Sequence, residues 1–183
     1  MTFMETERLI LRNVKTEDAA IIHDYRNNEI CANHQRGQVK YLDGIVQLLQ
    51  RRKEDVLGVD APFMIAVALK DTDEMVGEIV VMPEDGTISL GYTFSYRHHR
   101  KGYAYENLSA LISLLHKTYQ TWDFISFTEP ENLPSMNLLL KLGYKNMSYI
   151  PHLEAQVFEK WKKPAIEEEI AGAVHRKLSW LCG

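Results

Sequence analysis

Residues 98–104, HHRKGYA, combine four basic or imidazole side chains with one glycine and lie directly before a stretch with helical apolar spacing. The first turn of a helix leaves backbone N–H groups unpaired and carries a partial positive charge. Gly102 would let a ligand approach this backbone closely. Arg100 and Lys101 add positive charge at its rim. The turn therefore predicts a site for an anion such as a diphosphate.

Other uses of this turn have less support in the sequence than a diphosphate site. A P-loop needs G-x-x-x-x-G-K-[ST] and a dinucleotide fingerprint needs two more glycines, and the sequence has neither. Zinc binding by His98 and His99 is disfavoured, because neighbouring residues point apart and no further His or Cys pair has ligand spacing. We predict no metal. A nucleic-acid patch with tyrosines as stacking residues, and a simple solvated turn, remain alternatives.

Composition limits the class of protein. The 183 residues are 45% apolar and 25% charged, as expected for a globular chain. The formal charge of −4 argues against general nucleic-acid binding. No apolar run approaches the ~20 residues of a membrane span, and the N-terminus does not resemble a signal peptide. The two cysteines, Cys31 and Cys182, make no disulfide framework, so we predict a cytoplasmic protein.

Hydrophobic periodicity predicts the elements that position the turn. Strands are predicted at 6–12, 63–69, 75–82, 87–96 and 122–128, with a closing pair at 144–149 and 154–161. Helices are predicted at about 16–28 with Thr16 as N-cap, at 43–54, at 104–118, at 132–142 with Gly143 as its stop, and at 165–181 after Pro164.

The order of these elements predicts the fold class. Residues 63–96 are typical of an antiparallel meander, with turns at 71–73 and 83–86. The strand at 87–96, the helix at 104–118 and the strand at 122–128 would form a β-α-β crossover, which places the basic turn at the amino end of a helix. The mixture predicts a single α/β (α+β layered) domain over 1–183, with 165–181 as an additional helix.

Four motifs carry a resemblance to a known family. The segment 99–104, HRKGYA, resembles the acyl-CoA pyrophosphate loop [RQ]-x-x-G-x-[GA] of the GNAT N-acetyltransferase superfamily. The segment 132–144 is similar to its N-x-x-[AS]…LG[FY] motif, and TERLILR and LGYTFS are similar to the branch of ribosomal-protein N-terminal acetyltransferases. His99 replaces the usual Arg or Gln, and Arg100 replaces a common glycine. The resemblance implies a mixed, mostly antiparallel twisted sheet flanked by helices.

The resemblance also implies an activity and a co-substrate. An acetyl group would pass from acetyl-CoA to a primary amine, on a protein N-terminus or a small molecule, by direct attack on the thioester. The cofactor-binding residues that it implies are Tyr92, Thr93 and Phe94 on a strand, His99, Arg100, Lys101, Gly102, Tyr103 and Ala104 in the loop, and Asn132. Asn132 is also a candidate N-cap before Pro134.

Two residues are candidates for the chemical step. Ser135 matches a serine that the related branch uses as the proton donor to the leaving thiolate, while Leu139 occupies the usual tyrosine position. Similar enzymes often have a glutamate at the position of Ser89, which this chain lacks. The candidate general base is therefore Glu78 on the neighbouring predicted strand, acting alone or through water, and a solvated strand carboxylate is the alternative. A dedicated base is not required, since an α-amine has a pKa near ~8. Tyr25, His34 and Tyr41 lie in the region that related proteins use for the acceptor.

Two other functions stay open at this point. A catalytically weak acyl-CoA-binding module would fit the uncertain base and the altered loop. An RNA-associated protein would use the basic patch at 96–101. A homodimer built from the meander edge and the last helix is also open.

Overall fold

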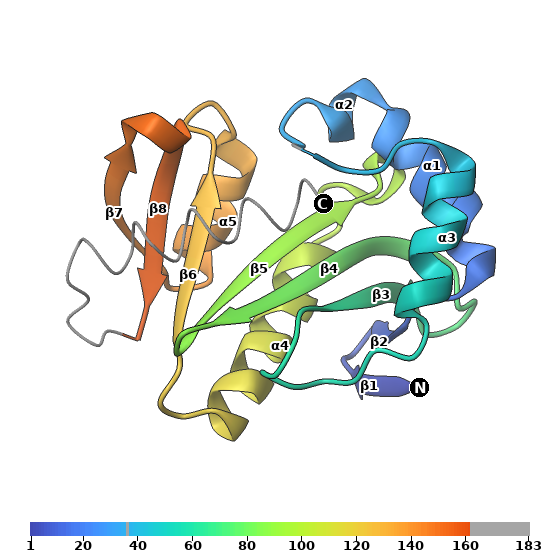
Figure 1. Cartoon of the computed structure of the whole chain (residues 1–183), viewed down its shortest axis with the longest axis horizontal. Coiled ribbons are helices and arrows are strands. Elements are labelled where there is room, and N and C mark those ends of the chain that lie inside the picture. Colours follow the sequence, from blue (N-terminus) through green and yellow to red (C-terminus); the bar gives the residue numbers. More distant parts are fainter. Residues whose placement is uncertain (36, 162–183) are drawn as a thin grey trace.

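The computed structural model of the chain describes residues 1–35 and 37–161. In this part, eight strands form one sheet in the order β1-β2-β3-β4-β5-β6-β8-β7 (Figure 1). The strands are β1 (Thr2–Glu5), β2 (Leu9–Asn13), β3 (Phe63–Leu69), β4 (Met75–Glu84), β5 (Thr87–Phe94), β6 (Asp123–Thr128), β7 (Lys145–Ile150) and β8 (Ala155–Lys160). The helix predicted at 165–181 lies outside the described residues.

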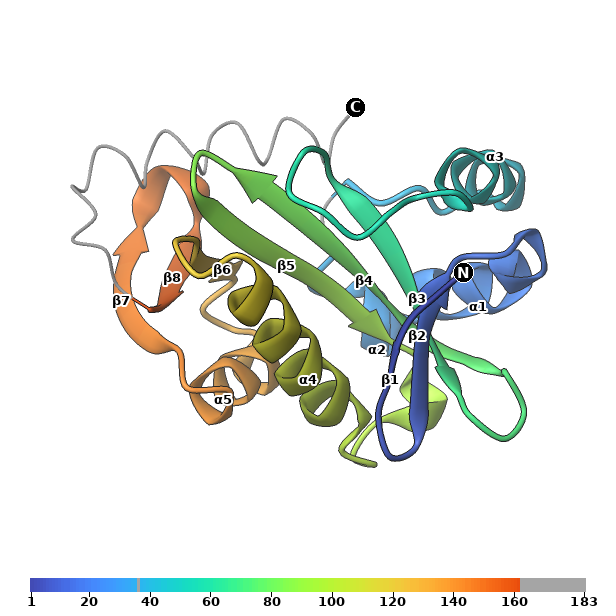
Figure 2. The same cartoon turned by 90° about the horizontal axis from the view of Figure 1, so that it is seen from below.

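Helices cover both faces of the sheet (Figure 2). Helices α4 (Tyr103–Thr118) and α5 (Leu133–Lys141) lie on one face, and α1 (Ala19–Asn27), α2 (Glu29–Ala32) and α3 (Leu42–Arg52) lie toward the other. Short 3-10 turns occur at Thr16–Asp18, Tyr96–His98 and Pro151–Leu153. The mixed sheet between helical layers confirms the predicted α/β class. No helix of the described residues is long and apolar enough to cross a membrane.

Strand alternation divides the core into two clusters. Leu108 and Leu115 of α4 pack with one set of strand side chains, which includes Ile79 and Ile88. On the other face, apolar residues of α1 and α3 pack with a second set that includes Met64. Burial of each large apolar side chain stabilises the fold by about 1.5–3 kcal/mol. The two clusters hold β4 and β5 rigidly in the middle of the molecule.

The sheet is incomplete between β5 and β6. These two strands are parallel, as the predicted β-α-β crossover requires, but only Thr87, Ile88 and Ser89 of β5 have partners on β6. Beyond this point β5 continues to Phe94 and β6 to Thr128 without further pairing between them. Figure 1 shows the two strands diverging toward their carboxyl ends. The second half of β5 therefore has one edge that no neighbouring strand covers.

Most predicted elements are confirmed, with shifts at their ends. The meander is antiparallel throughout. The last strand pair is also confirmed, with β8 inserted between β6 and β7. The turn predicted at 83–86 is shorter, because Pro83 and Glu84 still pair with Ile88 and Thr87. Asp85 and Gly86 make the turn alone, with φ of 46° and 78°. Positive φ at both positions is what a two-residue hairpin requires.

Two predictions near the N-terminus are wrong. Thr16 is not an N-cap but lies inside a 3-10 turn, and α1 begins only at Ala19. The buried carboxylate of Asp18 takes the capping role for that turn, since it accepts a hydrogen bond of 2.8 Å from the Lys15 N–H. The strand predicted at 6–12 starts only at Leu9, and β1, which was not predicted, pairs with its outer side.

Candidate active site

The loop before α4 has the backbone geometry of an anion cradle. Arg100 and Gly102 both have positive φ, at 61° and 81°. Gly102 is the N-cap of α4, and its carbonyl accepts the first helical hydrogen bond from Glu106 N–H at 3.0 Å. The N–H groups of the first turn have no partners within the helix. A Cβ on Gly102 would meet only the Arg8 Nη2, at 3.5 Å.

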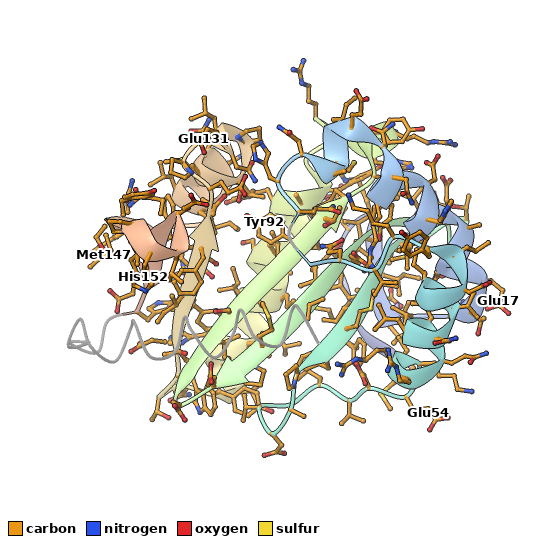
Figure 3. The ribbon with its side chains drawn as sticks, turned by 45° about the horizontal axis from the view of Figure 1, so that its top comes forward. Glu17, Glu54, Tyr92, Glu131, Met147 and His152 are labelled. Atoms are coloured by element: carbon orange, nitrogen blue, oxygen red, sulfur yellow. The ribbon has the colours of Figure 1, made fainter. Side chains whose placement is uncertain are left out.

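The uncovered half of β5 faces α5. Tyr92 lies on β5 at the side toward β6 and α5 (Figure 3). Its hydroxyl is 2.8 Å from the Oγ of Ser135. Asn132 caps α5 by accepting a hydrogen bond of 3.2 Å from the Ser135 N–H. The N-cap therefore fixes Ser135 at the start of the helix, where its hydroxyl meets Tyr92.

Burial keeps the phenols of this region protonated. Burial raises the pKa of Tyr92 to about 12, although the hydrogen bond with Ser135 opposes the change. Burial also raises the pKa of Tyr144, and Ser126 partly offsets this effect. The hydroxyl oxygens of Tyr144 and Ser126 are buried without a hydrogen bond of normal geometry to the described residues. Hydroxyl groups from β5, β6 and α5 thus gather where the strands diverge.

The opposite face of β4 and β5 carries a buried ion pair. Arg26 of α1 donates three hydrogen bonds to Glu78, two to Oε1 at 3.0 and 2.7 Å and one to Oε2 at 2.8 Å. Only 3% of Arg26 and 2% of Glu78 are exposed. Tyr25 is wholly buried beside them, and burial, then the charge of Glu78, raises the pKa of its phenol. Glu78 stands opposite Thr93 in the β4–β5 ladder, so this pair lies one strand away from the uncovered edge.

A short segment after α1 reaches across from β5 to the end of β6. The thiol of Cys31 donates to the Phe94 carbonyl at 3.3 Å. Gln35 donates to the Thr93 hydroxyl at 2.9 Å. His34 Nδ1 lies 2.8 Å from Glu129 Oε2, just beyond β6. We call residues 31–35 the strap. Through these contacts the strap links the end of β5 to the residue that follows β6.

Comparisons with known proteins agree with this geometry. The family model of the acetyltransferase (GNAT) domain matches residues 8–145. The chain belongs to the GNAT acetyltransferase family. An uncharacterised N-acetyltransferase, p20 of Bacillus licheniformis, is 24% identical over 94% of this chain and 100% of its own length. The protein is therefore an acetyltransferase by family.

Two solved structures show the same GNAT fold. A GNAT-family acetyltransferase from Bacillus anthracis has a TM-score of 0.75 and 22% identity, over 87% of this chain and 98% of its own. The ribosomal L7/L12 α-N-protein acetyltransferase RimL, solved with coenzyme A, has a TM-score of 0.73 and 12% identity, over 87% and 97% of the two chains. At these identities the likeness concerns the fold.

The GNAT loop residues lie together, and several of their side chains are already engaged. Arg100, Lys101 and Gly102 are exposed. The His99 ring is 2.9 Å from the Phe94 carbonyl, so this imidazole links the loop to β5. Tyr103 starts α4. Nearby, Arg97 pairs with Asp24 and His98 with Glu74, at 3.3 Å in both cases. These two pairs reduce the free positive charge that an RNA-binding patch would need.

The predicted acceptor residues end up in three different places. Tyr25 is in the core, His34 is in the strap, and Tyr41 is 84% exposed. Sequence reasoning missed Arg26 and Gln35, since nothing local distinguishes a buried arginine from a solvated one on a helix. A hollow of about 540 Å³ near Asn13 and Lys15 has no lining residue on β5, β6 or α5, so we do not assign it to the acetyltransferase site. Within residues 1–35 and 37–161, no group of three side chains is arranged to hold a metal ion.

Proposed function

We propose that this protein is an acetyl-CoA-dependent N-acetyltransferase that acetylates a primary amine by direct attack on the thioester. The loop before α4 is the observation that supports this most. Arg100 and the N-cap Gly102 are both left-handed and are separated by one residue. We expect this turn to direct backbone N–H groups of 100–104 toward a common concavity. Such a concavity at a helix start suits a diphosphate. Bound acetyl-CoA would supply the activated acetyl thioester.

The uncovered edge of β5 would bind the extended arm of coenzyme A. Residues 90–94 keep their ladder with β4 but have none with β6. Apart from the Phe94 carbonyl, which Cys31 and His99 engage, their outward N–H and C=O groups can pair with the two amides of the pantetheine arm, as an added strand would. An N–H of the same edge, in the range Tyr92–Phe94, would stabilise the negative charge on the thioester oxygen during attack. Asn132 contributes by fixing the start of α5 across the opening.

Ser135 and Tyr92 would protonate the leaving thiolate together. The two hydroxyls share one hydrogen bond of 2.8 Å, so a proton given up by Ser135 can be replaced from Tyr92. The phenol stays protonated at neutral pH because burial raises its pKa to about 12. Leu139, at the usual tyrosine position, is buried in the core and has no proton to give. The phenol therefore comes from Tyr92 on β5, whereas the usual tyrosine position of the family lies on α5.

The structure favours a supporting role for Glu78. Its carboxylate accepts three hydrogen bonds from Arg26 and is almost completely buried. Proton uptake by Glu78 would leave the guanidinium of Arg26 buried without its counter-charge, which is costly. An acceptor amine with a pKa near ~8 can instead enter in its neutral form and lose the second proton to water. The base role of Glu78 stays a prediction, and its test is the pH profile of the Glu78→Gln variant.

The experiment for the proposed function has two arms. Calorimetry with coenzyme A measures binding, and release of free thiol from acetyl-CoA over a panel of amines measures transfer. The panel contains peptides with free N-termini, polyamines and aminoglycosides. Binding together with amine-dependent thiol release is the expected result. Absence of heat with coenzyme A would refute the proposal.

A second function, an acyl-CoA-binding module with weak catalysis, has one observation in its favour. The only carboxylate predicted as base is held by Arg26. Binding of coenzyme A without thiol release for any amine in the panel would support this module over the enzyme.

A further inference from the structure

The diphosphate loop rests on a charged cluster from the other end of the chain. Arg8, in the turn between β1 and β2, and Glu106, in the first turn of α4, are 98 residues apart in sequence. The backbone N–H and the Nε of Arg8 donate to the two carboxylate oxygens of Glu106 at 2.9 and 2.7 Å, and Nη2 lies 2.6 Å from Oε2. Thr6 adds a hydrogen bond of 2.6 Å to Oε1. The β1–β2 turn is thereby fastened to the start of α4.

The same guanidinium contacts Lys101 and Tyr103 of the loop and approaches Gly102 between them. Its Nη1 donates to the Lys101 carbonyl at 3.1 Å. Its Cζ lies 4.7 Å from the ring centroid of Tyr103. Its Nη2 is 3.5 Å from the place where Gly102 would carry a Cβ. All three guanidinium nitrogens of Arg8 thus contact Glu106 or the Lys101 carbonyl.

Charge explains why this contact matters for an anion site. A carboxylate in the first turn of α4 would repel a diphosphate bound a few residues away. Burial by itself would raise the pKa of Glu106, but the hydrogen bonds from Thr6 and Arg8 outweigh it and lower the pKa, so Glu106 is charged at neutral pH. Arg8 supplies the compensating charge. Arg100 and Lys101 then remain available for the ligand.

We propose that Arg8 is a positioning residue for the diphosphate loop: it holds residues 101–103, with the left-handed Gly102 at their centre, in place and neutralises Glu106, without contacting the ligand. This inference rests on the proposed binding of coenzyme A. It assigns a function to the TERLILR motif, which the catalytic proposal leaves unused. The loop works through backbone N–H groups, whose directions depend on a fixed turn. A loop without this support would lose affinity specifically for carriers that have a diphosphate.

The test compares Arg8→Ala with a matched control, Arg97→Ala. Arg97 is also an exposed arginine, pairs with Asp24 at 3.3 Å and lies 5.5 Å from the centroid of Tyr96. It has no contact with residues 101–103 among those described. Dissociation constants are measured for coenzyme A and dephospho-coenzyme A by calorimetry, and for pantetheine, which lacks the diphosphate, by ligand-observed NMR. Circular dichroism checks that each variant is folded.

We expect Arg8→Ala to weaken coenzyme A and dephospho-coenzyme A equally, by about tenfold, which corresponds to about 1.4 kcal/mol. Pantetheine binding should stay within about twofold, and Arg97→Ala should change none of the three by more than this. Adding Glu106→Gln to Arg8→Ala should recover part of the loss, because the unpaired carboxylate is removed. Arg8→Lys keeps the charge beside Glu106 but not the planar fork, so its loss of affinity should lie between those of Arg8→Ala and the unmodified protein. If Arg8→Ala does not fold, the same affinities are measured with Arg8→Lys instead.

Three results would overturn the inference. If Arg8→Ala lowers the affinity for coenzyme A but not for dephospho-coenzyme A, Arg8 binds the 3′-phosphate directly. Equal loss with pantetheine would mean a general structural effect. Unchanged binding in Arg8→Ala would mean that the loop keeps its shape unaided. Failure of the unmodified protein to bind coenzyme A would instead refute the proposed function, and the two failures are therefore distinguishable.

Discussion

The hydrogen bond between Tyr92 and Ser135 leads to a double-mutant test of the proton donor. If the two hydroxyls deliver one proton, Ser135→Ala should lower kcat by roughly 10²-fold, the lower end for a general acid. Tyr92→Phe leaves the serine in place without its 2.8 Å partner and should have a smaller effect. The double variant should be no slower than Ser135→Ala, because residues that act as one unit are not additive.

The assay is thiol release at saturating acetyl-CoA and amine, with Tyr119→Phe as the control. Tyr119 follows the last turn of α4, at the far end from the loop, and should keep full activity. Multiplicative losses in the double variant would show that the hydroxyls act independently. A kcat within about twofold of the parent for Ser135→Ala would refute the proton-donor role altogether.

Tyr92 also has a stability signature that is independent of catalysis. Its folded-state pKa of about 12 exceeds the unfolded value of 10.0, so the folded state keeps its proton more tightly. This contribution is fully present below pH 10 and is lost as the pH rises from about 10 to about 12, with an upper limit of roughly 3 kcal/mol. Denaturant titrations across this range should show a shallower decline for Tyr92→Phe than for the parent protein. Equal slopes would mean that the phenol is not buried in solution.

Three further predictions follow from single contacts. Gly102→Ala should cost about 1 kcal/mol of stability, because φ is 81°, and should weaken coenzyme A binding in calorimetry; unaltered affinity would contradict the cradle. Glu78→Gln should lower the free energy of unfolding by about 3 kcal/mol, since Arg26 keeps a buried charge, yet leave the pH profile of kcat/KM unchanged. A lost basic limb in that profile would instead restore Glu78 as the base. His34→Ala breaks the contact with Glu129 and should raise the KM for the amine while the Kd for coenzyme A stays constant. A raised Kd for coenzyme A with an unchanged KM for the amine would instead place the strap beside the acetyl-CoA site.

The elements and the loop were predictable because their signals are local. The short apolar run Phe63–Leu69 and the apolar spacing in Tyr103–Thr118 each identify one element, and the observed ends agree with the prediction within one residue. The loop motif specifies backbone shape, and a glycine before a helix is readable from sequence. The short strand Thr2–Glu5 and the four-residue helix Glu29–Ala32 were missed, because so few residues carry no measurable period.

The side-chain chemistry of the site was not predictable in the same way, since each important contact joins distant residues. Arg26 and Glu78 are 52 residues apart, and Tyr92 and Ser135 are 43 apart. Glu78 could be named as a carboxylate near the site, but its partner could not. Tyr92 was predicted for its backbone alone, and its hydroxyl contact depends on how α5 packs across the diverging strands.

Among the long-range contacts, those around the uncovered edge of β5 share one use, whereas the Arg26–Glu78 pair lies on the opposite face of the sheet. A parallel pair of strands that separates after three residues leaves backbone groups and hydroxyls without strand partners. Such groups are costly unless something else satisfies them, and an extended ligand with amides and a diphosphate can do so. The pair Tyr92–Ser135 spans the opening, the strap ties its two sides, and the β1–β2 turn supports the loop at its base. These three sets of contacts fix the shape of the gap between β5 and β6. A fixed gap of this kind is what the proposed binding of an acyl carrier there needs.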